Sequence, residues 1–256
     1  MHVRCERVPS AAGRSPNDPA GLLGDLRLLG ERRGETIAAV DEDSGIVLAA
    51  LGIHPERDEG GTFFRLDTFG VHPGHRGEGL EPVLVGEAER HLRAHKAHRL
   101  KFGTSPLLTA GAALWVTRYG TRYRWREGVR TPEGQPWPFV SCECDFDDPL
   151  ARPLDLRDEE AVEKSVLDWE GGKPRRRKGV VYSGPLAVLL PDLDGESLGQ
   201  AAAADPDCLP TLFSVFHELY RHGYGFAWFD RLPPGMAGAG PAAPSWYYVM
   251  HRVVSF

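Results

Sequence analysis

The sequence predicts an α/β fold built on a mixed sheet, with a second and smaller α/β domain, on three observations. The chain has 256 residues, of which 41% are hydrophobic, enough for the core of one large or two modest domains. Runs typical of strands alternate with helical patterns along the first half. A segment rich in proline and aspartate, DFDDPLARPLD at 145–155, separates that half from a second mixed series. We therefore expect domains at 1–148 and 149–256.

In the first domain, β-branched and aromatic runs bounded by turn residues mark the strands. A hairpin with an acidic turn is predicted at 36–53, and a third apolar run follows at 62–71. From Leu80 to about His98 apolar residues recur at helical spacing, which predicts an amphipathic helix. The remaining predicted elements are a strand at 3–8, one or two short helices at 19–33, a strand at 99–104, a helix at 112–120 and strands at 121–130 and 136–146.

The second half is predicted to contain a helix, a basic loop, a strand, a helix and two strands, at 158–169, 171–179, 185–192, 210–222, 223–232 and 246–254. RYGTRYRW at 118–125 and RHGYGFAW at 221–228 share arginine, glycine, an aromatic residue and tryptophan in one register. This echo suggests a partial repeat of the helix–strand–strand end of the first half. Chance similarity between two aromatic hairpins explains it nearly as well.

Composition and charge narrow the class of protein. A net charge of -6 argues against a protein that coats nucleic acid. The four cysteines are too scattered for a disulfide framework, and Cys142 and Cys144 fit one face of a strand better than a metal site. The N-terminus has no apolar signal segment and no stretch approaches a membrane span, so a cytoplasmic protein is expected.

The segment VHPGHRGEGL, 71–80, joins an apolar strand to the long helix and contains three glycines and an arginine. Backbone N–H groups at a helix N-terminus are unsatisfied and attract anions. Glycine lets the backbone approach a phosphate without a Cβ in the way. A simple turn would need one glycine, so the segment predicts a phosphate-binding loop to which Arg76 adds charge. The spacings of the P-loop and of the dinucleotide fingerprint are absent.

This loop, read as V-x-P-x-x-R-G-x-G-L before an amphipathic helix, resembles the acyl-CoA-binding motif of the GNAT N-acyltransferases. Its residues here are Val71, Pro73, Arg76, Gly77, Gly79 and Leu80. The resemblance covers residues 1–148 and implies the GNAT acyl-CoA N-acyltransferase fold, with a sheet splayed between its fourth and fifth strands. It also implies acetyl-CoA as co-substrate, direct attack by an amine on the thioester, and no metal.

The resemblance also implies a set of cofactor-binding residues. The pantetheine arm would pair with the backbone of the strand, and the pyrophosphate would rest on N–H groups of the loop. These residues are Phe69, Gly70, Val71, Gly74, His75, Arg76, Gly77, Glu78, Gly79 and Leu80.

Two positions depart from the family pattern. Gly74 stands where the family loop usually begins with glutamine or arginine. Val116 stands where a tyrosine commonly protonates the leaving thiolate, and Tyr119 or Tyr123 could replace it only if the helix end is remodelled. The catalytic acid is therefore unassigned.

A base is also required, because an amine must lose its proton before it attacks. Asp67 precedes Val71 on the same strand, where relatives often have their base, and it is the predicted catalytic residue. The alternative is an exposed strand aspartate without a catalytic role. Glu143 and Asp145 are weaker candidates.

Two further clusters are interpreted as solvated surface. His91, His95 and His98 share a helix whose last turns are rich in arginine and lysine, which favours a solvated helix end over a zinc site. KPRRRK at 173–178 is interpreted as a solvated loop. Contact with the 3′-phosphate of CoA, with RNA or with an acidic partner remains the alternative for it.

These observations predict an N-acetyltransferase that acts on a small-molecule or peptide amine acceptor. Its second half would have no CoA site, because it contains no comparable glycine loop, and would instead cover the acceptor, extend the sheet or support a homodimer. The rival hypothesis is a non-catalytic module on the same scaffold, which senses acyl-CoA or binds a partner through KPRRRK. The acceptor and the acyl chain length do not follow from the sequence.

Overall fold

The computed structural model describes residues 2–8, 34–109, 119–130, 134, 137–149, 158–193, 195–237 and 243–252. The helix expected at 19–33 and most of the helix expected at 112–120 lie outside these ranges. The chain forms two compact units, the first from 1–102 with 145–148 and the second from 103–144 with 149–256. The domain division between 148 and 149 stays a prediction.

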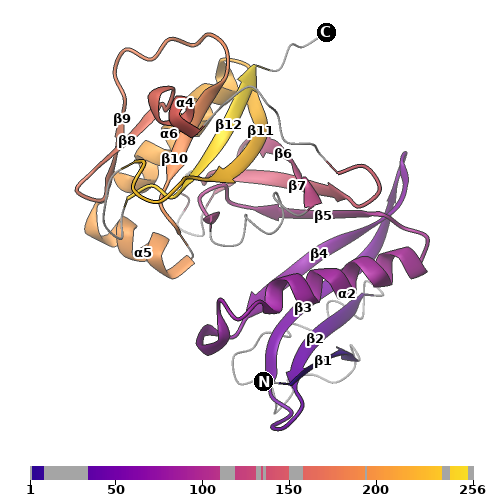
Figure 1. Ribbon diagram of the computed structural model, residues 1–256. Coiled ribbons are helices and arrows are strands. Elements are labelled where there is room, and N and C mark those ends of the chain that lie inside the picture. Colours follow the sequence, from indigo (N-terminus) through magenta and orange to yellow (C-terminus); the bar gives the residue numbers. More distant parts are fainter. Residues whose placement is uncertain are drawn as a thin grey trace. The chain divides into compact units, whose positions relative to one another are not determined.

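The first unit is a sheet with one long helix packed on it (Figure 1). Its strands, in sheet order, are β1 (Val3–Val8), β2 (Glu35–Asp41), β3 (Val47–Asp58), β4 (Gly61–Val71) and β5 (Arg99–Thr104). Neighbours are antiparallel except β4 and β5, which are parallel. Such a mixed sheet confirms the predicted fold class.

Helix α2 (Leu80–Ala94) connects β4 to β5 and packs on β2, β3 and β4. Its apolar residues recur every three or four positions and are buried, which is why this stretch forms an amphipathic helix: Leu80, Leu84, Val85, Ala88 and Leu92. The helix ends before the predicted His98, because Lys96 takes a left-handed φ of 56°.

Strand β4 is irregular at the position that matters for function. Gly52 faces Thr68 and Ile53 faces Leu66, so Asp67 is the extra residue of a β-bulge. On its other edge β4 pairs with β5 at Phe64 and Arg65. Past Arg65 the described register holds no further β4–β5 pair, in agreement with a sheet that splays between these strands.

The described part of the second unit contains two hairpins and a three-stranded sheet, with helices beside them. Strands β6 (Arg122–Arg126) and β7 (Phe139–Asp145) form an antiparallel hairpin, as do β8 (Leu167–Glu170) and β9 (Lys173–Arg176). Strands β10 (Leu186–Leu190), β12 (Trp246–Arg252) and β11 (Tyr224–Arg231) form an antiparallel sheet in that order. The helices are α4 (Asp158–Glu163), α5 (Gly195–Ala204) and α6 (Cys208–Arg221).

Aromatic side chains fill the core of the second unit. Tyr123 of β6 lies 5.8 Å from Phe226 and 6.0 Å from Tyr248, between ring centroids. Trp125 stacks on Phe216 of α6 at 6.2 Å. Strands β6 and β7 therefore share one aromatic core with the C-terminal sheet and α6.

Two elements of the second unit differ from their predictions. The helix expected over 158–169 ends at Glu163. Trp169 lies in β8, which pairs with β9, and its ring Nε1 donates to the carbonyl of Leu189 at 2.8 Å. The expected loop at 171–179 is in part strand β9. Gly171 and Gly172, with φ of 56° and 78°, make the tight turn that joins β8 to β9.

The geometry of the second unit is compatible with the partial repeat. The second unit includes the end of β5, at Gly103 and Thr104. The order in the sheet is β5-β7-β6, and in the C-terminal sheet it is β10-β12-β11. In both, the last strand in sequence lies between the other two. Tyr123 and Phe226 occupy corresponding positions of the two echoing segments and touch each other. The repeat stays a prediction.

Candidate functional site

The segment between β4 and α2 forms a compact, exposed loop. A single 3₁₀ turn covers Pro73–His75, and α2 begins at Leu80. His72 holds the turn: its Nδ1 accepts a hydrogen bond from the N–H of Gly74 at 3.1 Å, and its carbonyl accepts one from the N–H of His75 at 2.9 Å. The loop is thus ordered by its own contacts.

Two glycines set the path of the chain into the helix. Gly77 and Gly79 have φ of 80° and 79°, in the left-handed region, and open space surrounds the position of a Cβ at both. At Gly74 a Cβ would make an ordinary contact with the His72 ring, at 3.4 Å. The left-handed backbone therefore requires glycine at two of the three positions, Gly77 and Gly79.

The entry to α2 presents unsatisfied backbone donors. Gly79 is the N-cap residue, and no side chain caps the helix. Within the described ranges no hydrogen bond occupies the N–H groups of Gly77, Gly79 and Leu80. Because these donors lie at the positive end of a helix dipole, the loop can bind an anion such as a phosphate.

The side chains of the loop modify its charge. Arg76 is exposed and adds a positive charge beside the free donors. Glu78 would repel an anion, but its carboxylate is paired with His75 Nδ1 at 2.9 Å. The predicted cofactor-binding residues thus lie together from the end of β4 to the start of α2.

Asp67, the predicted base, is an exposed residue of β4 whose side chain has a histidine partner. Its Oδ2 lies 2.5 Å from His54 Nδ1, and His54 of β3 is only 4% exposed. The other ring nitrogen of His54 lies 2.9 Å from Glu56 Oε1. The bulge aims the Asp67 side chain at this imidazole, and the catalytic role of Asp67 stays a prediction.

Glu56 completes the network. Its carboxylate accepts hydrogen bonds from Arg65 Nε at 2.8 Å and Nη2 at 3.0 Å. Arg65, followed by His54, lowers the pKa of Glu56 to about 2. His54 was missed by sequence reasoning, because it lies on β3, far from the motif, and only the β3–β4 register brings it to Asp67.

The catalytic acid remains unassigned. Val116 lies outside the described residues. Tyr123 belongs to the aromatic core of the second unit, where burial raises the pKa of its hydroxyl well above the usual range. Of the weaker base candidates, Asp145 lies 3.8 Å from His98, and its other oxygen accepts hydrogen bonds from the backbone N–H groups of Asp147 and Asp148. These contacts suit a role in the turn after β7.

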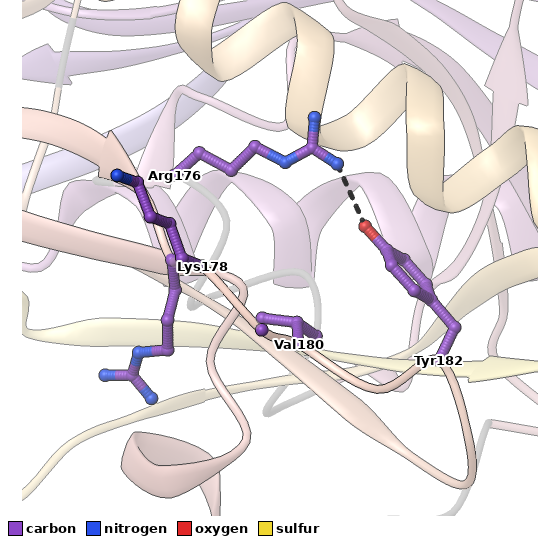
Figure 2. Close-up of a pocket in the computed structure, with 6 residues that line it drawn as sticks. Arg176, Lys178, Val180 and Tyr182 are labelled. Atoms are coloured by element: carbon purple, nitrogen blue, oxygen red, sulfur yellow. Dashed lines mark hydrogen bonds between the residues drawn. The ribbon is translucent and has the colours of Figure 1, made fainter.

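The basic run 173–178 is partly engaged in internal contacts. Arg176 pairs with Glu218 of α6 and donates to the Tyr182 hydroxyl at 3.2 Å (Figure 2). Arg177 binds Asp168 and donates to the carbonyls of Val162 and Glu163, both at 2.8 Å. Arg176, Arg177 and Lys178 line an open cavity of about 370 Å³. The run is therefore not wholly a solvated loop, since Arg176 lies in β9 and both arginines have partners in the second unit, although Arg176 stays exposed.

Comparison with known proteins gives one family match. Residues 6–120 match the model of the Acetyltransferase (GNAT) family. No curated protein matches the sequence. None of the helices in the described ranges combines the length and hydropathy that a membrane crossing requires.

Several solved structures resemble the chain at low identity. An IAA acetyltransferase from Bacillus cereus is 17% identical over 56% of this chain and 99% of its own, with a TM-score of 0.43. A GNAT family acetyltransferase from Elizabethkingia anophelis with acetyl-CoA bound is 15% identical over 56% and 97%, with a TM-score of 0.43. A Bacillus subtilis acetyltransferase in complex with CoA is 16% identical over 56% and 99%, with a TM-score of 0.42.

Proposed function

We propose that this chain, in which residues 6–120 form a GNAT acetyltransferase domain, transfers an acetyl group from acetyl-CoA to an amine acceptor. One observation supports this most directly: the entry to α2 combines two left-handed glycines, no capping side chain and free N–H groups. This arrangement suits a pyrophosphate. It lies directly after β4, beside which the sheet opens.

The loop would hold the diphosphate of acetyl-CoA. The N–H groups of Gly77, Gly79 and Leu80 would donate to phosphate oxygens, and Arg76 would add charge. The acyl-pantetheine arm would lie along Phe69, Gly70 and Val71. A backbone N–H of this strand would polarise the thioester carbonyl, a contact worth about 3 to 4 kcal/mol in comparable sites.

Transfer would proceed by direct attack. The acceptor nitrogen forms a C–N bond to the acetyl carbon, the C–S bond breaks, and CoA leaves as its thiolate, which then takes up a proton. The acceptor arrives as an ammonium ion and must first lose a proton. Asp67 is the base we assign to this step. His54, held by Glu56, acts as a positioning residue that fixes the orientation of the Asp67 carboxylate.

The proposal is tested by calorimetric titration of acetyl-CoA into wild type and into Gly77→Asp. The substitution adds a Cβ and a negative charge where the diphosphate would bind, so binding is expected to be lost. Gly128→Asp is the matched control, because Gly128 also has a left-handed φ, 76°, with open space around its Cβ position, but lies after β6. It carries the same backbone strain and should bind acetyl-CoA like wild type.

Equal loss in both variants would mean that backbone strain and not the phosphate contact is responsible. No binding by wild type would leave the loop as a turn and would favour the non-catalytic alternative. If wild type binds, amine acceptors can be screened with a thiol assay for released CoA, with small-molecule amines and peptides as the two classes.

A further inference from the structure

A cluster of metal-binding side chains lies in the first unit, away from the proposed acetyl-CoA loop. Three residues each offer one ligand atom: Glu35 at the start of β2, His91 in the last turn of α2 and His95 directly after that helix. These atoms lie within 4.8 Å of one another. His91 and His95 are four residues apart, so the helix presents both imidazoles to the same side. Their ring centroids lie 4.3 Å apart.

His91 is the unusual member. Only 3% of this histidine is exposed, and within the described residues neither ring nitrogen has a hydrogen-bond partner. Its nearest polar neighbour is a Glu35 oxygen, 3.7 Å from Nδ1, which is too long for a hydrogen bond. Buried polar groups are seldom left without a partner, so this imidazole lacks an interaction that the cluster would supply.

One ring nitrogen of His95 has a partner and the other keeps its lone pair. Its Nδ1 donates to the carbonyl of His91 at 2.9 Å, which leaves Nε2 as the lone-pair nitrogen. Metal-bound histidines usually donate their other N–H to a carbonyl or carboxylate in this way. His95 is exposed, so an ion can reach the cluster from solvent.

We propose that Glu35, His91 and His95 form a zinc site. Two imidazoles and one carboxylate, with water as the fourth ligand, are a ligand set typical of Zn²⁺. Ligand atoms around tetrahedral zinc lie about 3.3 Å apart. The three ligand atoms now lie within 4.8 Å of one another, so zinc binding would draw the side chains of the exposed His95 and the partly exposed Glu35 inward.

Among the described residues, an arginine of β1 competes for the Glu35 carboxylate. Arg7 of β1 lies 3.7 Å from the same Glu35 oxygen that faces His91. At that distance and with both side chains exposed in part, the ion pair is weak. Phe64 forms an apolar wall, with its ring 5.4 Å from His91 in an edge-to-face arrangement. Zinc binding to Glu35 would therefore disrupt this weak ion pair with Arg7.

Zinc at this site would join the end of the α2 segment to the start of β2, two elements that pack on each other. An ion that binds the folded chain and not the unfolded one raises its stability, so the expected effect of the metal is on the melting temperature.

The test is calorimetric titration of Zn²⁺ into the chelator-treated full chain, with the melting temperature measured with and without zinc. Wild type is expected to bind one zinc ion and to melt at a higher temperature with it. Glu35→Gln and His95→Asn each remove one ligand outside the core and should weaken binding by about tenfold or more. His98→Asn is the control, because this half-exposed histidine of the same segment lies outside the cluster.

Substitution of His91 is left out of the test, because it also changes the packing of a buried side chain. Zinc binding that survives in both Glu35→Gln and His95→Asn would assign the ion to other residues and overturn the proposal. So would the absence of a stoichiometric zinc ion in wild type. Because acetyl-CoA binding is measured separately, failure of the zinc site leaves the proposed function untouched.

Discussion

At the scale of single residues, the structure places Asp67, the predicted base, in a network of side-chain contacts. Asp67 gains a buried histidine partner because a bulge in β4 and the register with β3 point both side chains at each other. β-bulges often occur next to active sites, since they re-aim one side chain without disturbing the sheet. His54, Glu56 and Arg65 extend this network across two strands.

Asp67→Asn is expected to lower kcat for acetyl transfer by about 100-fold or more at neutral pH, because an amide cannot accept the proton of the acceptor. The dissociation constant of acetyl-CoA should stay near the wild-type value. The two quantities are measured by a CoA-release assay and by calorimetry. Full activity in Asp67→Asn would remove it from the proposed mechanism.

His54→Asn should give a smaller fall in kcat than Asp67→Asn, with acetyl-CoA binding retained. The reason is that His54 orients the Asp67 carboxylate and does not touch the substrate in the proposed mechanism. The double variant is expected to be no slower than Asp67→Asn alone, since a positioning residue matters only when its target is present. Additive losses would show that the two residues act independently.

At the scale of elements, ion pairs connect strands and make stability depend on pH. Glu56 of β3 is held by Arg65 of β4, and its pKa of about 2 lies below the usual value of 4.5. A lowered carboxyl pKa contributes stability that is fully present above pH 4.5 and is lost as the pH falls through about 2.

Glu56→Gln should therefore destabilise the protein at pH 7, by about 1 kcal/mol once solvent screening of this partly exposed pair is allowed for. The difference from wild type should shrink as the pH falls from 4.5 toward 2. Urea unfolding of both proteins at pH 7, 4 and 3 measures this difference in the free energy of unfolding. Glu59→Gln, in the exposed turn between β3 and β4, serves as the control and should change little.

The basic run offers a second element-scale prediction, because two of its arginines differ in their contacts. Arg177→Ala removes hydrogen bonds to Asp168 and to two carbonyls before β8, and should lower the free energy of unfolding by about 1.5 to 3 kcal/mol. Arg175→Ala, an exposed position of β9, should have almost no effect. Chemical denaturation of both variants measures the two changes in the free energy of unfolding. Equal changes would contradict the structural role of Arg177.

At the scale of the whole molecule, the compact units do not follow the chain in two simple halves. The strands β6 and β7 group with the C-terminal residues, and Tyr123 and Trp125 contribute to that core. A boundary drawn at 148 would separate these side chains from Phe216, Phe226 and Tyr248.

A fragment of residues 1–148 is therefore expected to expose Tyr123 and Trp125 and to aggregate or bind a hydrophobic dye. Co-expression with 149–256 should restore a well-folded complex, because the aromatic core is then complete. Gel filtration and dye fluorescence distinguish the cases. A fragment that stays monomeric and melts cooperatively without 149–256 would show that the N-terminal domain folds independently, as the sequence-based division supposes.

Much of the fold was predictable because its signals are local. Apolar runs bounded by turn residues predict β2, β3 and β4, and helical spacing predicts α2, since each signal depends on neighbours a few residues away. The glycines of 71–80 predict the anion-binding loop for the same reason: a left-handed φ is a property of one residue. The match of 6–120 to the GNAT family confirms the resemblance that rested on those residues.

What only the tertiary structure decided concerns partners that are distant in sequence. His54 meets Asp67 through strand register, His91 is buried against β2 although its neighbours predict a solvated helix end, and Arg177 is bound by Asp168 across a hairpin. In each case the side chain alone allows several environments. Burial and pairing are chosen by how whole elements pack, which local sequence does not encode.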